Sequence, residues 1–498
     1  MKGQTKFALY DYQRDLISAY HNNKEVITLY PRQSGKDLVT STELLTPDGF
    51  KQIGDIHPGD YVYGDDGKPT LVTAESEVFT DHNMYRVSFD DGTSLVASET
   101  HQWTVNSRRK EHKQYTLTTK QLLDSVWRKK NNRGYYEYTY YIPNTAPVEF
   151  PKSELQIDPY VLGCWLGDGS SRTPHLTCHR EHTQHFVDNG LSLRMLSSTE
   201  HKTAPTYVIE NLTTTHLRAH DLLQTDTQHK TKHIPVQYHT ACVADRIALL
   251  QGLLDTDGFI NERGTEAAIQ LTRKNERLIN DIEQLLWSLG LKPRRKVFEK
   301  TNSIRLSFIT GRDYFDLFRI PHKLNRQLPT MKGVRYTLSR TITNIEYVGN
   351  DIESKCISVA NDNHLYLAGR ALIPTHNSET TCAYLFWFAI FNEDKTILIT
   401  SNKHKNALEM ISRIKYMYEH LPNFLKPGVT EDGWNKLSLM FETGSRMISD
   451  ATSDSTGRGG SFSILFCLSG ENTVTVRNKR TGVVEDLPIE SLYTRLQK

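Results

Sequence analysis

The sequence lacks the features that mark several large classes of protein. Its six cysteines are scattered, with no Cys-x-x-Cys pair, so their spacing supports neither a zinc site nor a disulfide framework. Lys and Arg number 60 against 58 Asp and Glu, so the charge of the whole chain does not mark a nucleic-acid binder. The most apolar run, residues 382–391, is about half of a membrane span and is typical of a buried helix. With no secretory start either, these absences favour a cytoplasmic protein.

What remains is a folded chain of several domains. At 498 residues it is too long for one core, and the usual domain size suggests roughly three or four. Apolar residues make up 37 % of the chain, which is enough for packed cores, and no repeat of solenoid period appears. Contacts to DNA would have to come from local basic runs at residues 128–130 and 292–296, although each run also fits an ordinary solvated face.

A phosphate-binding loop starts near the amino terminus and then stops. Residues 26–30 predict a strand that leads into PRQSGK, which ends at Lys36, but Asp37 follows where Ser or Thr is needed to reach magnesium. The Asp48-Gly49 turn beyond it predicts a β-hairpin instead of a helix. Ser378 opens a predicted buried helix, SETTCAYLFWFAIF, and a predicted strand at 396–400. Joining Lys36 to Ser378 therefore restores a complete phosphate loop.

The joined flanks resemble the ATPase of the large terminase subunit of tailed phages. Gln13 stands where that family contacts adenine, and residues 32–36, with Arg32, Gly35 and Lys36, match its variant Walker A loop. Residues 421–428 and 454–466 match the stretches before its next strands. The resemblance implies that the spliced flanks bind ATP and Mg²⁺, with the Ser378 hydroxyl on the metal.

Both ends of the inserted segment resemble an intein that occupies residues 37–377. The opening, with TELLT followed by Asp48-Gly49, matches the first intein block, and the segment ends on His376-Asn377 before Ser378. The Asn377 amide can attack its own carbonyl to form a succinimide, with His376 as acid or base. The resemblance implies that the insert excises itself and joins its flanks.

Asp37 cannot take the place of the Cys or Ser with which most inteins start. The sequence resembles the minority of inteins that use an internal cysteine with a tryptophan and a threonine, and these fall at Cys356, Trp103 and Thr375. The resemblance implies that the Cys356 thiolate attacks the Lys36 carbonyl while His101 protonates the leaving amide. The acyl group then passes to the Ser378 hydroxyl, Asn377 cyclises, and His364 assists that cleavage.

Two related stretches inside the insert predict a second activity. VLGCWLGDGS (161–170) and LLQGLLDTDGFI (249–260) are each an apolar helix with a small residue in the middle and an acidic end. Close packing of the two helices would bring Asp168 and Asp257 together as a site for Mg²⁺. The stretches resemble the paired motifs of LAGLIDADG (DOD-type) homing endonucleases.

That resemblance adds residues and a partner to the expected nuclease. Lys232, in KHIP, falls at the position of the lysine that polarises water, and Lys323 is a counterpart in the second half. Strands and the basic residues Arg294, Arg295 and Lys296 are expected to meet phosphates. The expected partner is double-stranded DNA, namely the uninterrupted terminase gene.

The carboxyl end contains a second interruption of the ATPase pattern. Cys467 opens CLSGENTVTV, which resembles an intein beginning with a nucleophilic cysteine, where acidic Walker B residues are expected. One reading is the amino-terminal piece of a split intein, whose partner polypeptide carries its complementary fragment and the rest of the terminase. The other is a truncated gene.

The sequence thus predicts a multidomain chain, in which an all-β Hint (intein) fold is interrupted by an α+β LAGLIDADG domain and flanked by pieces of an α/β P-loop ATPase. The expected boundaries are 1–36 (ATPase), 37–150 (splicing), 151–335 (endonuclease), 336–377 (splicing), 378–466 (ATPase) and 467–498 (split-intein fragment). The alternatives are an ATPase with a passive insertion and an endonuclease that no longer splices. The interrupted loop argues against the first, and the intact His376-Asn377-Ser378 end against the second.

Overall fold

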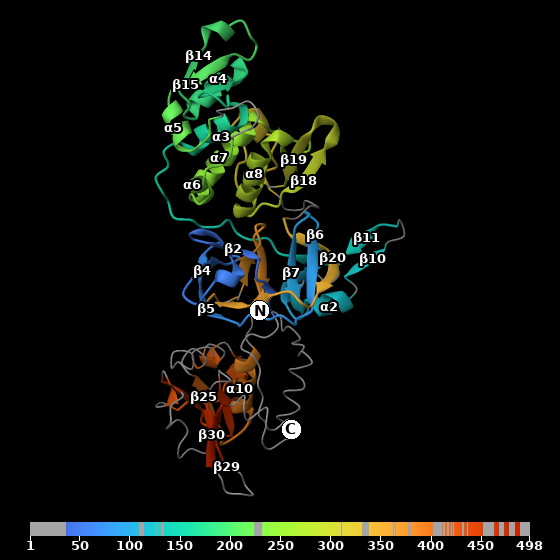
Figure 1. The fold of residues 1–498 in the computed structure, drawn as a ribbon, viewed down its shortest axis with the longest axis vertical. Coiled ribbons are helices and arrows are strands. Elements are labelled where there is room, and N and C mark those ends of the chain that lie inside the picture. The colour runs from blue at the N-terminus through green and yellow to red at the C-terminus, as the bar shows by residue number, and fades with distance from the viewer. Residues whose placement is uncertain are drawn as a thin grey trace. The chain divides into compact units, whose positions relative to one another are not determined.

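The chain divides into two compact units, one of residues 35–377 and one of residues 1–34 and 378–498 (Figure 1). The computed structural model describes residues 36–108, 114–125, 127–130, 134–223, 232–309, 311–330, 338–361, 363, 365–376, 380–401, 411, 414–415, 418–419, 421, 423–430, 433–435, 437–451, 463–467, 473–477 and 484–488. Both breaks between the units lie within two residues of the ends expected for the insert, at Asp37 and Asn377.

The larger unit contains a strand-rich portion, residues 36–150 and 338–376, which we call the β part. Its strands are β1 (Leu38–Val39), β2 (Glu43–Thr46), β3 (Gly49–Gln52), β4 (Tyr61–Tyr63), β5 (Pro69–Glu75), β6 (Met84–Phe89), β7 (Ser94–Ser98), β8 (Gln102–Ser107), β9 (Gln114–Thr118), β10 (Arg128–Lys130), β11 (Tyr136–Tyr138), β12 (Tyr140–Ile142), β20 (Arg340–Gly349), β21 (Ser354–Lys355), β22 (Ile357–Val359), β23 (Leu365–Ala368) and β24 (Ile373–His376). One short helix, α2 (Thr119–Asp124), and the 3-10 turn Ile53–Asp55 complete it. The predicted hairpin at Asp48-Gly49 is confirmed, because β2 pairs with β3 and Gly49 takes the positive φ of +109° that the turn needs.

The sheets of the β part bring the two ends of the insert together. The largest sheet has the order β21-β1-β7-β6-β20-β12-β8-β9, and a second has the order β24-β23-β2-β3. Strand β1, directly after the first residue of the insert, pairs with β21, while β24, at its last residues, pairs with β23. Apolar side chains of these strands fill one core that includes Leu38, Trp103 and Tyr366. Segments about 300 residues apart in sequence therefore pack in one place.

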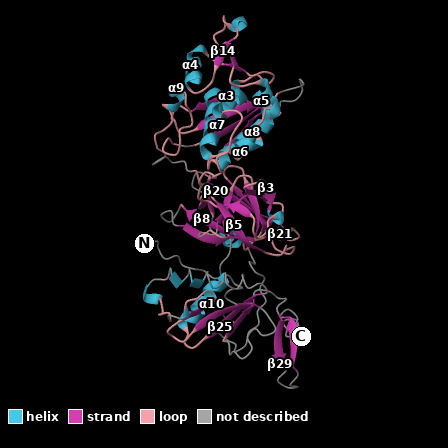
Figure 2. Ribbon diagram, turned by 90° about the vertical axis from the view of Figure 1, so that its left-hand side faces the viewer, coloured by secondary structure: helices cyan, strands magenta, loops and turns pink. Residues whose placement is uncertain are grey.

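The remaining portion, residues 151–330, is the α+β part. Its helices are α3 (Pro159–Asp168), α4 (Arg180–Asp188), α5 (Thr214–Ala219), α6 (Val236–His239), α7 (Val243–Thr256), α8 (Glu276–Ser288) and α9 (Pro321–Leu324). Its strands form two sheets, β13 (His175–Thr177), β15 (Thr206–Ile209) and β14 (Leu193–Met195) in one, and β16 (Gly258–Ile260), β17 (Ala267–Thr272), β19 (Ser303–Phe308) and β18 (Arg294–Phe298) in the other. Short 3-10 turns lie at Ser197–Thr199, Arg273–Asn275 and Glu299–Thr301. Figure 2 shows α3, α7 and α8 packed with the strands of this part.

Helices α3 and α7 pack backbone to backbone through glycine. A Cβ added at Gly163 would lie 2.2 Å from the Leu249 carbonyl oxygen, and one at Gly252 would lie 2.3 Å from the Tyr160 carbonyl oxygen. Either distance is far inside van der Waals contact, so only glycine fits at these two positions. The expected close packing of the two acidic stretches is therefore confirmed.

The α+β part enters and leaves the β part at two neighbouring strands. Strand β12 pairs with β20, with Ile142 and Arg340 as Cα partners. Polar contacts join the parts close to this point, because the buried Lys292 ammonium lies 3.1 Å from Asp90 Oδ2 and donates to the Ser339 carbonyl at 2.7 Å. The α+β part is therefore an insertion between paired strands.

The smaller unit holds a mixed sheet. Helix α10 (Thr380–Phe391) precedes β25 (Thr396–Ser401), which pairs in parallel with β27 (Arg446–Ala451) and β28 (Ile464–Cys467), and β26 (Ser438–Met440) pairs antiparallel with β27. The 3-10 turn Asn423–Leu425 and a hairpin of β29 (Thr473–Arg477) and β30 (Val484–Pro488) are also described. The helix at 380–391 and the strand at 396–400 are confirmed. The expectation that the apolar run is wholly buried is wrong, because Trp387 is 42 % and Phe391 56 % exposed, while Leu385 and Phe386 line the core.

Within the described ranges, no helix has both the length and the apolar character that a membrane crossing requires.

Candidate functional site

The peptide bond between Lys36 and Asp37 is buried and contacts an imidazole. His101 stands directly before β8, is fully buried, and its Nδ1 lies 2.8 Å from the Lys36 carbonyl oxygen. A carbonyl oxygen can only accept, so Nδ1 carries the proton and Nε2 is left as an acceptor. Burial lowers the pKa of His101 to about 4, so the ring is neutral near pH 7. A neutral donor therefore polarises the carbonyl that splicing would have to open.

The second ring nitrogen of the same imidazole contacts the other end of the insert. The Thr375 hydroxyl on β24 is within hydrogen-bond reach of His101 Nε2, and both side chains are fully buried. Trp103, on β8, packs edge-on against the His101 ring with 4.9 Å between centroids, and its indole donates to Thr119 Oγ1 at 3.0 Å. Trp103 and Thr375 thus fix the orientation of His101, which is how the structure brings three of the predicted residues together.

Strand register places Cys356 opposite Asp37. Because Leu38 pairs with Lys355 in the antiparallel ladder of β1 and β21, the next pair of positions along it is Asp37 and Cys356. The Cys356 amide donates to Ser76 Oγ at 3.0 Å, which anchors the residue. The thiol is fully buried, and burial followed by the charge of Asp37 raises its pKa to about 12. Cys356 is a protonated thiol in this state of the chain.

The Asp37 side chain is held by two residues that the sequence did not single out. Its Oδ2 lies 3.0 Å from His82 Nδ1 and accepts from Ser354 Oγ at 2.5 Å. Burial acts to raise the pKa of Asp37, but the hydrogen bonds from His82 and Ser354 outweigh it and lower the pKa. The Asp37 hydrogen bond raises the pKa of His82 in turn. His82 lies in a polar loop with no sequence signal, and only the folded ladder brings it to Asp37.

Several of the other predicted residues fall outside what the structure describes. Gln13, Arg32, Gly35, His364, Asn377 and Ser378 are not among the described residues, while His376 and Cys467 are described only as backbone, in β24 and β28. Lys36 is described and is buried beside Asp37. The roles of these residues in ATP binding and in the later splicing steps stay predictions.

The α+β part holds a pair of carboxyl groups at the ends of its two central helices. Asp168 is the last residue of α3, and Asp257 caps α7. Burial and then the charge of Asp168 raise the pKa of Asp257 to about 6, and burial raises that of Asp168. Asp168 is exposed and Asp257 is half-buried, and two carboxylates in each other's field are stabilised by a divalent cation. The residues present therefore fit Mg²⁺, although no cluster of three or more metal-binding side chains occurs among the described residues.

Two lysines cap the same helices in matching ways. Lys232 Nζ donates to the Trp165, Leu166, Gly167 and Gly169 carbonyls at 2.7–3.0 Å, and Lys323 Nζ donates to the Leu254, Asp255 and Gly258 carbonyls at 2.7–2.9 Å. Each ammonium thus neutralises the negative end of one helix, beside one carboxylate. Both positive charges act to lower the pKa values of Asp168 and Asp257. The two halves share one design, as the paired sequence motifs suggest.

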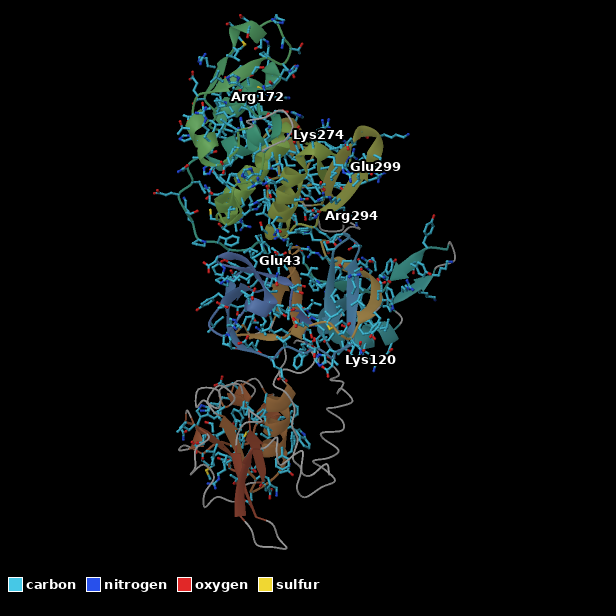
Figure 3. All side chains as sticks on the ribbon, in the orientation of Figure 1. Glu43, Lys120, Arg172, Lys274, Arg294 and Glu299 are labelled. Carbon is cyan, nitrogen blue, oxygen red and sulfur yellow. The ribbon has the colours of Figure 1, made fainter. Side chains whose placement is uncertain are left out.

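The basic run at residues 292–296 is only partly available to phosphates. Lys292 is buried and paired with Asp90, and Arg295 is bonded to Glu283 at 3.1 Å and to Glu276 at 3.2 Å on α8. Both charges are thus already paired within the protein, and the prediction that this run meets phosphates stays a prediction. Arg294, which Figure 3 labels on β18, lies 3.7 Å from Asp90 Oδ2, and both Arg294 and Lys296 are exposed and stay candidates.

Comparison with known proteins gives one family match. Residues 244–319, which include α7 and Asp257, match the LAGLIDADG-like domain. The chain is 28 % identical over 430 residues to the replicative DNA helicase DnaB of Mycobacterium intracellulare, covering 81 % of this chain and 69 % of that protein. It is 35 % identical over 89 residues to the same helicase of Mycobacterium leprae, covering 18 % of this chain and 15 % of that protein.

Solved structures of two kinds are similar to the chain at low identity. The Msm DnaB1 intein splicing domain bound with zinc is 16 % identical, with 68 % of this chain and 99 % of that one covered and a TM-score of 0.23. The homing endonuclease I-DmoI in complex with DNA and Mn is 15 % identical, with 34 % of this chain and 96 % of that one covered and a TM-score of 0.22.

Proposed function

We propose that residues 37–377 are an intein that excises itself and joins Lys36 to Ser378. One observation carries the proposal: the buried His101 ring bonds the Lys36 carbonyl through one nitrogen and meets Thr375 through the other. A single imidazole therefore spans both ends of the insert, at the bond that the interrupted phosphate loop requires to be cut.

In the first step, the Cys356 sulfur attacks the Lys36 carbonyl carbon. A carbon–sulfur bond forms, the bond from that carbon to the Asp37 nitrogen breaks, and the thiol proton ends on the new amine. His101 stabilises the developing oxyanion through Nδ1–H. Because the neutral ring has only this one proton, it acts as acid by relaying the thiol proton: it takes that proton from the sulfur and gives it to the amine as the bond breaks, and the ring ends neutral. Asp37 takes no covalent part, because His82 and Ser354 hold its carboxylate.

The later steps rest on the sequence. The acyl group moves from sulfur to the Ser378 hydroxyl, Asn377 cyclises with help from His376 and His364, and an oxygen-to-nitrogen shift leaves a peptide bond. Each step conserves atoms and needs no cofactor.

The test is the mass of the products when the whole chain is expressed. We expect a ligated product of residues 1–36 and 378–498 together with the free insert, and we expect Cys356→Ala to give only the full-length chain or cleavage at Asn377. Cys242→Ala is a matched control, since that thiol lies in the α+β part. Clean cleavage after Lys36 in Cys356→Ala would falsify the assignment.

We further propose that the α+β part is an endonuclease that cuts double-stranded DNA at the uninterrupted host gene. The support is the Asp168 and Asp257 pair at the ends of two glycine-packed helices, together with the match of residues 244–319 to the LAGLIDADG-like domain. Mg²⁺ bound there would activate water and stabilise the leaving phosphate oxygen. Lys232 and Lys323 hold positive charge beside the carboxylates, and exposed Arg294 and Lys296 meet phosphates.

A plasmid that carries the joined Lys36 and Ser378 codons with their flanks is the substrate for this test. The excised insert should linearise it with Mg²⁺ and leave a plasmid with the interrupted gene intact. Asp168→Asn should bind the plasmid without cutting it, and equal cutting of both plasmids would contradict the assignment.

We propose that the flanks are parts of a phage terminase ATPase that binds ATP and Mg²⁺ only after splicing. The parallel pairing of β25 with β27 and β28, next to α10, suits an α/β ATPase. A further trans splice at Cys467, with a partner polypeptide, would complete the ATPase, and ATP hydrolysis by the purified spliced product plus that partner is its test.

A further inference from the structure

The Tyr366 hydroxyl is buried without a hydrogen-bond partner. The side chain is fully buried on β23, and its oxygen has no partner in the described part of the chain. A buried hydroxyl that makes no hydrogen bond destabilises a fold, and phenylalanine would fill the same space without that penalty. The hydroxyl therefore calls for an explanation other than packing.

The ladder places Tyr366 at the candidate splicing centre. Tyr366 and Thr375 are Cα partners on the antiparallel strands β23 and β24. Residues directly opposite each other in such a ladder send their side chains to the same face of the sheet. Thr375 on that face meets His101, which bonds the Lys36 carbonyl. Tyr366 thus points to the face where the bond is to be cut.

The charges around the phenol connect it to the nucleophile. Burial, followed by the charges of Cys356 and Asp37, raises the pKa of Tyr366 well above its ordinary value. The phenol therefore keeps its proton and is a donor at any pH at which the chain is folded. The Cys356 thiol, in contrast, must lose its proton. Among the described residues, the hydrogen-bond partner of its sulfur is the Ile357 carbonyl at 3.6 Å, and a carbonyl oxygen cannot stabilise an anion.

We propose that the Tyr366 hydroxyl is a catalytic hydrogen-bond donor to the Cys356 sulfur, and that its partner exists only while the sulfur is a thiolate. The inference rests on the proposed splicing function. Tyr366 keeps its own proton throughout, and the proton that leaves the sulfur ends on the Asp37 amine as the carbon–sulfur bond forms and the carbon–nitrogen bond breaks. An interaction made only with the charged form lowers the barrier without stabilising the resting thiol.

The experiment isolates the first step and changes one atom. In the full chain with Asn377→Ala and Ser378→Ala, only thioester formation at Lys36 remains, and hydroxylamine cleavage reports its rate. Tyr366→Phe should slow this cleavage about 10- to 100-fold near pH 7, the range expected for one hydrogen bond to a charged group. The rate should also rise at higher pH than in the parent, because the thiolate is harder to form.

Two controls separate this role from packing and from failure of splicing itself. Tyr63→Phe removes a phenol that is buried against Phe150 in the same β part and should leave the rate unchanged. Tyr366→Phe should melt at the same or a higher temperature, since it removes an unpaired polar atom. An unchanged rate, or a slower rate with the parent pH profile, would overturn the inference. Cleavage that survives Cys356→Ala would instead overturn the splicing proposal on which it rests.

Discussion

The two candidate centres of the larger unit differ in the burial and the charge of their functional groups. At the splicing centre, His101, Thr375 and Cys356 are fully buried, and the shifted pKa values of His101 and Cys356 both favour neutral groups. At the nuclease centre, Asp168 is exposed and Asp257 is half-buried, and Lys232 and Lys323 add opposite charge around them. The reacting groups of the splicing centre are buried and neutral, while the nuclease centre gathers charged groups at an accessible place.

The difference follows from where each substrate comes from. The bond to be spliced is part of the chain, so its centre can close completely and raise the strength of each hydrogen bond by excluding water. A nuclease must admit both a cation and DNA, so its carboxylates stay accessible. Their negative charges repel each other until a cation binds. Asp257→Asn at the nuclease centre and His82→Gln at the splicing centre should therefore have opposite effects on stability.

The largest expected effect is that of Asp257→Asn, which should lower DNA cleavage about 1000-fold or more, since the metal loses a charged ligand. The same change should stabilise the metal-free protein. The folded pKa of about 6 lies above the ordinary value of 3.8, so the penalty of ionisation grows as pH rises between them and is complete above pH 6. At pH 7.5 we expect a gain of up to about 2 kcal/mol by urea unfolding. Unchanged or lower stability without metal would contradict the raised pKa of Asp257, which burial and then the charge of Asp168 produce.

Gly163→Val should destabilise the α+β part by about 3 kcal/mol or more, because even a Cβ would lie 2.2 Å from the Leu249 carbonyl oxygen. Chemical unfolding in a Cys356→Ala background measures this effect without splicing. Gly190→Ala is the matched control, since nothing lies within 4 Å of its Cβ and only its φ of +99° is unfavourable. We expect it to cost about 1 kcal/mol. Equal losses in the two variants would mean that helix contact is not what selects Gly163.

The smallest expected effect is that of His82→Gln at the splicing centre. The raised pKa of His82 adds stability that is complete below its unfolded pKa near 6.5 and is lost as pH rises through the folded pKa. The lowered pKa of Asp37 adds stability that is complete above about pH 4 and is lost as pH falls. Melting of the Cys356→Ala chain should therefore be highest between about pH 4 and 6.5, and His82→Gln should flatten the alkaline side by about 1 kcal/mol or less. A slope that survives His82→Gln would assign it to another group.

The sequence was most informative where a local pattern decides the structure. The turn at Asp48-Gly49, the helix at 380–391 and the close packing of the two glycine-containing helices follow from spacing and residue type, and the structure confirms them. The run at 382–391 shows what composition alone does not predict, because an apolar composition does not reveal which side of a helix the fold leaves exposed. Lys292 is a second example, because the sequence of a basic run does not reveal that Asp90 pairs with one of the lysines in it.

The residues that the sequence missed are those that long-range pairing brings in. His82 and Ser354 were assigned no role from the sequence, and Tyr366 lies in the block of His364 without having been singled out; the ladders around β1, β21, β23 and β24 bring these residues to the splicing centre. Sequence reasoning reached Cys356, Trp103 and Thr375 through resemblance to a family, which carries information about contacts that a single sequence does not contain.

The pairing of Ile142 with Arg340 has a consequence for how the chain can change over time. The whole α+β part is a loop between two hydrogen-bonded neighbours, and the entropy of closing a loop depends only weakly on its length. The nuclease can therefore be gained, lost or replaced by a short turn while the register of the surrounding strands stays fixed. A homologue in which a few residues join β12 to β20 should retain the splicing chemistry alone. Each activity can therefore be kept or lost independently of the other.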